Sequence, residues 1–146
     1  MKKPILTLII IILFAGLFAF NFTLKKKKSL QGAWTMVEGK WVTEDQTLNS
    51  IGSSSMKHMK VFTENHFATL AQNIEAENSY NYNGGSYTFK DGIYSENLTM
   101  SRSKQIIGTT LHYKVKIDGD RFYMDACDEN GNVLETGAFE VWERIK

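Results

Sequence analysis

Apolar and polar residues alternate along much of the chain after residue 30, which is the pattern of half-buried β-strands. The cleanest example runs from Leu111 to Ile117, where every second residue is apolar and the residues between are polar. Asp-Gly and Asn-Gly pairs separate such runs, as they do in β-hairpins. The pattern predicts eight strands, near residues 31–42, 56–63, 66–72, 85–90, 93–100, 107–117, 121–127 and 133–145.

The lengths of the connections indicate how these strands are arranged. Those after the second, fourth and sixth strands are tight turns, whereas those after the first, third and fifth are longer. In an up-and-down meander, alternate connections lie at opposite ends of the sheet, so one end is closed and the other open. The turn at residues 128–132 departs from this rule, being short at the open end. We therefore expect an all-β fold, an eight-stranded antiparallel up-and-down barrel, whose interior holds side chains or one small ligand.

An apolar segment precedes the predicted barrel. Residues 5–24 contain few polar side chains, and twenty helical residues at about 1.5 Å each just cross a ~30 Å hydrocarbon core. This predicts a single N-terminal transmembrane helix. The alternative is a signal peptide cleaved after Ala19, although Leu17 is larger than the residue usual at that position. Residues 1–28 thus form an anchor or signal segment, and residues 29–146 form one domain.

The lysines around this segment leave its orientation open. Lys25 to Lys28 favour a cytoplasmic C-terminus under the positive-inside rule, but Lys2 and Lys3 compete with them. The four-lysine run is equally suited to lying against anionic head groups. We therefore expect residues 5–24 to contact the membrane. The charges alone do not decide on which side of the membrane the domain lies.

The domain composition excludes several functions. Six of the 17 basic residues lie in residues 1–28, so the domain has eleven against 16 acidic residues, a net charge of about −5. This argues against binding nucleic acid, which needs a clustered basic face. Cys127 is the only cysteine, and the three histidines lack the spacing of metal ligands. A haem-binding barrel needs an inward-facing histidine, and only His58 is suited to that position. We expect no metal and no cofactor.

Two short motifs at the ends of the domain suggest how the barrel closes. Gly32 is followed two residues later by Trp34, and the chain ends near Trp142-Glu143-Arg144. The topology brings the start of the first strand and the end of the last to the same closed end. In the lipocalin-like superfamily, whose motifs these residues resemble, the glycine lets the entering chain pass close beneath the barrel, and the indole fills its floor beneath a guanidinium.

These residues resemble the Gly-x-Trp signature and the terminal arginine of the lipocalin-like (calycin) superfamily. The segments GGSYTFKDGIYSE and VWERI are also similar to small bacterial lipocalin-like domains on exported or membrane-attached chains. The resemblance implies that the barrel is closed by Gly32, Trp34, Trp142 and Arg144. It also implies that the domain lies outside the cytoplasm, held there by the membrane anchor. If the signal segment is cleaved, the domain is instead secreted or periplasmic. The chain lacks the disulfides and long helix of large secreted lipocalins, so a transport role does not follow.

Barrel interiors of this kind carry an aromatic and polar set that can orient a ligand. A buried carboxylate must be paired or neutral, and Glu96 alternates in phase with the apolar Tyr94, Leu98 and Met100 of its strand. We expect non-catalytic binding of a small hydrophobic or amphipathic ligand at the membrane surface. The alternatives are a filled barrel with a structural or protein-interaction role, and an enzyme using Glu96 and a tyrosine as acid and base. The candidate ligand-binding residues are Tyr87, Tyr94, Glu96, Tyr113 and Arg121.

Overall fold

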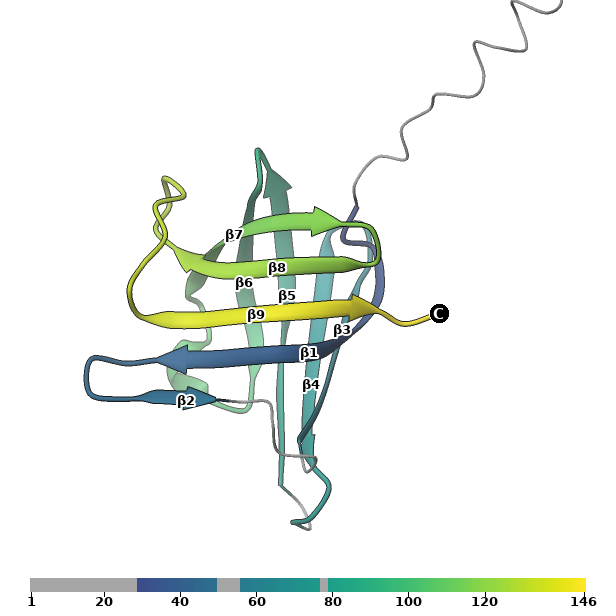
Figure 1. Cartoon of the computed structure of the whole chain (residues 1–146), viewed down its shortest axis with the longest axis vertical. Coiled ribbons are helices and arrows are strands. Elements are labelled where there is room, and N and C mark those ends of the chain that lie inside the picture. Colours follow the sequence, from purple (N-terminus) through teal and green to yellow (C-terminus); the bar gives the residue numbers. More distant parts are fainter. Residues whose placement is uncertain (1–28, 50–55, 77–78) are drawn as a thin grey trace, which may run out of the picture.

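A computed structural model describes residues 29–49, 56–76 and 79–146. Apart from one short 3-10 turn, η2 (Lys104–Ile106), the regular elements of these residues are all strands (Figure 1). The strands are β1 (Gly32–Val42), β2 (Thr47–Asn49), β3 (Met56–Phe62), β4 (His66–Asn73), β5 (Tyr80–Lys90), β6 (Ile93–Ser101), β7 (Thr110–Asp118), β8 (Arg121–Cys127) and β9 (Gly137–Arg144).

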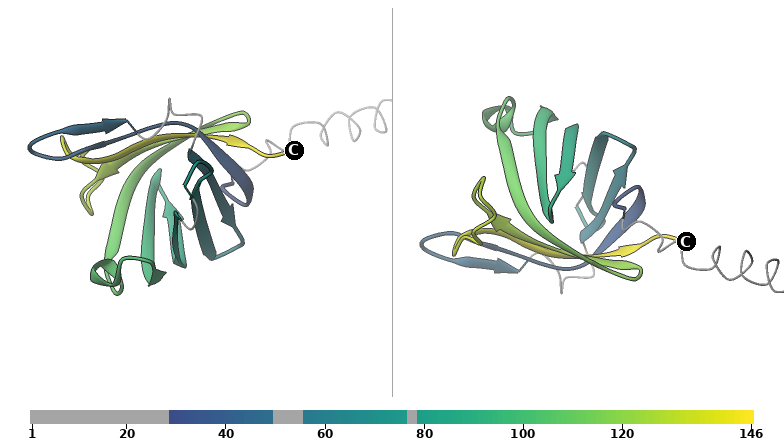
Figure 2. Two further views of the ribbon diagram at one scale, coloured as in Figure 1. Left: turned by 90° about the horizontal axis from the view of Figure 1, so that it is seen from below. Right: turned by 90° about the horizontal axis from the view of Figure 1, so that it is seen from above.

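The strands form one closed antiparallel barrel. Each strand from β3 to β8 pairs with the next, β1 pairs with β3, and β1 also pairs with β9, which closes the sheet. Figure 2 shows the sheet curving round on itself until these strands meet. The predicted eight-stranded up-and-down barrel is therefore confirmed, and its closure removes the exposed sheet edges that invite aggregation.

The first strand changes partners along its length. Residues Gly32 to Thr35 pair with β3, whereas β9 pairs with β1 from Trp34 to its end, across an irregularity between Met36 and Glu38. At its far end, β1 keeps its pairing with β9 on one edge, and on the other edge it pairs with β2, a short extra strand, in place of β3. The sequence prediction treated all of residues 43–55 as a loop, and the β1–β2 hairpin corrects this.

The fifth strand starts earlier than predicted, and β6 bulges opposite its residues Gly84 and Gly85. Tyr80 to Asn83 pair with β4, so β5 extends five residues before the predicted start at residue 85. A Cβ on Gly85 would lie 1.9 Å from the carbonyl oxygen of Asn97, so only glycine fits against β6 there. Because the register shifts at this bulge, Met100 points outward, although strict alternation placed it with the interior residues.

Two other strands are shorter than predicted at the open end. Residues 107–109 belong to the turn after η2, so β7 begins at Thr110. Before β9, the Asp128 carboxylate accepts hydrogen bonds from the backbone N–H groups of Asn130 and Asn132. This turn holds the chain away from the sheet, and Val133 makes only an isolated bridge to Cys127.

The closed end is filled by a stack of aromatic rings. Trp34 is fully buried, its indole N–H donates to the carbonyl of Leu30 at 2.7 Å, and the Phe122 ring packs edge-on at 4.8 Å between centroids. Phe122 in turn stacks on Trp142 at 5.9 Å. Aromatic pairs in these arrangements stabilise a core beyond their buried area, so this stack forms a solid floor to the barrel.

Arg144 covers this floor from outside. Its guanidinium carbon lies 4.0 Å from the centre of the Trp34 ring, and its nitrogens donate to the carbonyls of Gln31 and Ser29. Gly32 has a φ of +120° and lies beneath the guanidinium, where a Cβ would be 2.7 Å from Nη1. The structure therefore places Gly32, Trp34 and Arg144 in mutual contact.

The predicted membrane or signal segment, residues 1–28, lies outside the described residues. Within the part of the chain that the structure describes, no helix is long and apolar enough to cross a bilayer.

Arg144→Ala removes the cation–π contact and both hydrogen bonds. We expect it to lower the free energy of unfolding by about 1–3 kcal/mol and to change the tryptophan emission spectrum. Urea denaturation followed by fluorescence measures both. Arg121→Ala is the matched control, because Arg121 is exposed and its surface ion pair contributes little. Equal stability of the Arg144→Ala and parent proteins would contradict the role of Arg144 in holding the floor.

Candidate functional site

Above the aromatic floor, the barrel interior encloses a cavity of about 200 Å³. Its wall combines apolar groups, such as Met36 and Leu111, with a layer of ionisable side chains. Buried charges are costly unless they are paired, so the contacts of this layer show what the cavity can accommodate.

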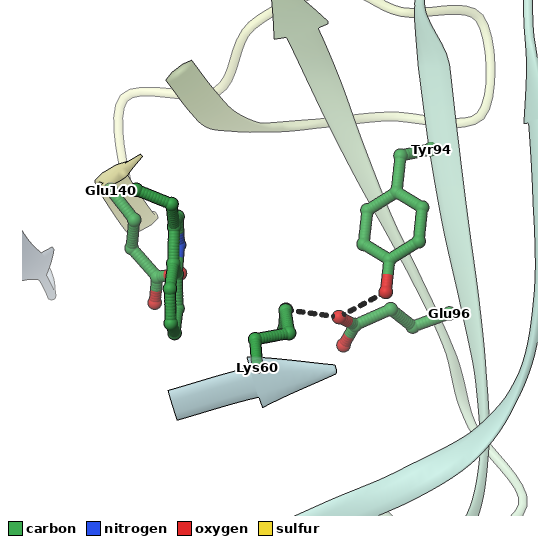
Figure 3. Close-up of polar contacts among 5 residues, drawn as sticks. Lys60, Tyr94, Glu96 and Glu140 are labelled. Atoms are coloured by element: carbon green, nitrogen blue, oxygen red, sulfur yellow. Dashed lines mark hydrogen bonds and ion pairs between the residues drawn. The ribbon is translucent and has the colours of Figure 1, made fainter. Parts of the chain in front are cut away.

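A buried ion pair lies in this layer. Lys60 of β3 donates from Nζ to Glu96 Oε1 of β6 at 2.5 Å, and both side chains are about 95% buried. The Tyr94 hydroxyl donates to the same oxygen at 2.7 Å. Figure 3 shows the three groups converging, with Lys60 between Glu96 and Glu140. One carboxylate oxygen thus receives two donors.

Aromatic rings surround the ammonium group of Lys60. Its Nζ lies 5.4 Å from the centres of the Tyr94 and Trp142 rings, 5.6 Å from that of Phe67 and 5.8 Å from that of Phe62. Ring faces attract a cation most strongly when water is excluded. The positive charge of Lys60 is therefore balanced within the protein by Glu96 and these rings.

Glu140 of β9 supplies a second buried carboxylate. Its Oε2 accepts a hydrogen bond from the Trp142 indole at 2.9 Å, and the nearby Trp41 side chain also favours its ionised form. Burial raises the pKa of Glu140 above its ordinary value, although Lys60 and both indoles oppose the shift. The surroundings thus compensate the ionised form of Glu140 only in part.

His58 adds a neutral polar group to the wall. The side chain is buried, and its Nδ1 has no hydrogen-bond partner among the described residues. Burial lowers the pKa of His58, so the imidazole is neutral near pH 7. An unpaired buried nitrogen beside a cavity is available to a molecule inside it.

The structure brings together three of the five predicted ligand-binding residues. Glu96 and Tyr113 line the cavity, and Tyr94 lies directly behind them with its ring 6.0 Å from that of Tyr113. Tyr87 is buried nearer the closed end, where its hydroxyl donates to the carbonyl of Thr63. It packs in the core and does not line the cavity.

Arg121 lies away from the other four. It is exposed on the outer surface and donates to Glu143 Oε2 at 2.9 Å. Within β8 it alternates with Phe122, which points inward to the floor, so Arg121 must face solvent. The expectation that it contributes to the interior site is therefore corrected.

Sequence reasoning missed Lys60 and Glu140. In β3 the apolar Met59 and Val61 are exposed while His58 and Lys60 point inward, the reverse of the usual preference. The available signal was Phe62, because a large aromatic residue in phase with Lys60 and His58 indicates that all three share the inner face. Glu140 alternates in the same way with Trp142.

No metal centre is evident in the described ranges, where no three His, Cys, Asp or Glu side chains gather closely enough to hold an ion.

No protein-family model matches the chain, and no curated protein matches it. Among solved structures, a lipocalin-like protein from Bacteroides uniformis ATCC 8492 aligns with a TM-score of 0.51 and 12% identity over 80% of this chain and 98% of that one. This chain has a lipocalin-like fold. An uncharacterized protein from Bacteroides eggerthii DSM 20697 also aligns, with a TM-score of 0.51 and 15% identity over 80% of this chain and 100% of that one. At these identities the likeness concerns the fold alone.

Lys60→Met leaves the Glu96 carboxylate buried without its cation. We expect the free energy of unfolding to fall by about 3–5 kcal/mol, whereas Lys60→Met combined with Glu96→Gln should recover most of that loss. Urea denaturation of the parent, the two single variants and the double variant measures the coupling. Additive losses in the double variant would show that the two side chains do not depend on each other.

Proposed function

We propose that the barrel is a non-catalytic binding module for a small amphipathic molecule, which enters the cavity with its polar end toward Lys60, Glu96 and Glu140. The observation that carries this proposal is that the buried ionisable groups border an open space and not a filled core. Buried ion pairs are often no more stable than apolar residues of similar volume. A polar layer beside a cavity therefore suits recognition better than packing.

The cavity sets an upper limit on the buried part of the ligand. A protein cavity of about 150 Å³ holds benzene, so about 200 Å³ accommodates roughly eight non-hydrogen atoms. This is small beside the pockets of about 300–1,000 Å³ that bind drug-sized ligands. A long acyl chain does not fit inside as a whole, and a larger ligand would leave part of itself at the mouth near Trp41.

The catalytic alternative receives less support from the geometry. Burial and the neighbouring Glu96 raise the pKa of Tyr94 well above its ordinary value, so its phenol stays protonated at neutral pH. Glu96 already accepts hydrogen bonds from Lys60 and Tyr94 at one oxygen. A general acid and base work best with pKa values near the working pH, and this pair is arranged for a fixed contact.

Binding is tested with the full-length protein in phosphatidylcholine nanodiscs, which accommodate residues 5–24 without free detergent. We expect at least one six-carbon amphiphile among hexylamine, 1-hexanol and hexanoate to bind saturably at one site by isothermal titration calorimetry. Ala71→Phe places a ring in the cavity wall and should abolish this binding, while empty nanodiscs correct for partition into lipid. Absence of saturable binding for all three probes, or unchanged binding in a folded Ala71→Phe variant, would refute a cavity ligand.

A further inference from the structure

With Glu140 ionised, the charges around the cavity do not balance. Among the residues lining it, Lys60 is the one positively charged side chain, and Glu96 and Glu140 are acidic. His58, Tyr82 and Tyr113 complete the titratable groups of the wall. Burial lowers the pKa of His58 and raises that of Tyr113, so both are neutral near pH 7. With both glutamates ionised, the site carries one negative charge in excess.

An anionic ligand has no free cation to meet in this wall. Lys60 makes its ion pair with Glu96 and is enclosed by the four aromatic rings. An added carboxylate or phosphate would compete with Glu96 for the same ammonium group, and it would lie near the second buried acid, Glu140. Like charges at short range in a poorly solvated site repel strongly, so the cavity disfavours an anionic head group.

A cationic ligand meets the opposite conditions. Glu140 is buried in the cavity wall with the indole of Trp142 as a hydrogen-bond donor. An ionised carboxylate has about four lone-pair sites, so one donor leaves acceptor capacity. The aromatic residues Trp142, Trp41 and Tyr113 also line the cavity, and aromatic rings attract cations. The unpartnered Nδ1 of His58 is a further polar site in the same wall.

We propose that the molecule bound in this cavity carries a protonated amine or other organic cation, whose charge is recognised by Glu140 between Trp41 and Trp142. This assignment deepens the proposed function and rests on it. The cation neutralises the excess negative charge, and its short apolar part occupies the remaining space beside Met36, Leu111 and Met124. The buried acid then serves ligand selection and not the stability of the empty barrel.

The test compares head groups on one apolar chain. Hexylamine is cationic at pH 7, 1-hexanol is neutral and nearly the same size, and hexanoate is anionic. In the full-length protein in nanodiscs, we expect hexylamine to bind about tenfold or more tightly than 1-hexanol, as charge-assisted hydrogen bonds imply, and hexanoate to bind most weakly. This comparison needs no variant and so does not depend on how any substitution folds.

Glu140→Gln identifies the group responsible. It keeps the size of the side chain and an oxygen acceptor but removes the charge, so the preference for hexylamine over 1-hexanol should fall to within about threefold while 1-hexanol still binds. Glu143→Gln is the matched control, because Glu143 lies on the same strand but on the outer surface with Arg121. That variant should keep the parent preference.

The outcomes separate the two proposals. Tightest binding of hexanoate, equal binding of the three probes, or an unchanged preference in Glu140→Gln would overturn the cation assignment and leave the cavity as a binding site. Failure of all three probes to bind would remove the proposed function, and the cation assignment with it.

Discussion

The ion pair between Lys60 and Glu96 is the contact on which the barrel interior depends. It joins β3 to β6 across the middle of the barrel, with Tyr94 bonded to the same carboxylate oxygen and four aromatic rings around the ammonium group. Because neither charge reaches bulk water, each requires the other. The pair therefore lies at the boundary, along the barrel axis, between the apolar floor and the polar cavity.

This division separates structural from functional residues along the barrel axis. At the closed end, the guanidinium of Arg144 and the edge-on ring of Phe122 both pack against the buried Trp34. Toward the open end, Glu140 and His58 face a space that the protein does not fill. In the proposed function, the closed end serves stability and the cavity layer serves recognition. The negative charge that the protein leaves unbalanced then lies where a bound cation would neutralise it.

The sequence predicted the barrel well because turn residues and strict alternation are local features. It failed where pairing decides the outcome: the bulge at Gly85 turned Met100 outward, and the far end of β1 paired with β2. Of the site, Glu96, Tyr94 and Tyr113 were predictable from their strand faces. Lys60 and Glu140 were missed, although each alternates in phase with a buried aromatic residue of its own strand, Phe62 or Trp142. What the sequence does not show is that Lys60 meets Glu96 of another strand inside the barrel.

The central claim is that Glu140 carries a buried charge that the empty barrel compensates incompletely. The most direct measurement is the free energy of unfolding of the parent and of Glu140→Gln between about pH 4 and pH 8, starting near the ordinary pKa of a glutamate. Because burial raises the pKa of Glu140 in the folded state, the parent should lose stability relative to the variant as pH rises through that raised pKa. A stability difference that stays constant with pH would contradict the claim.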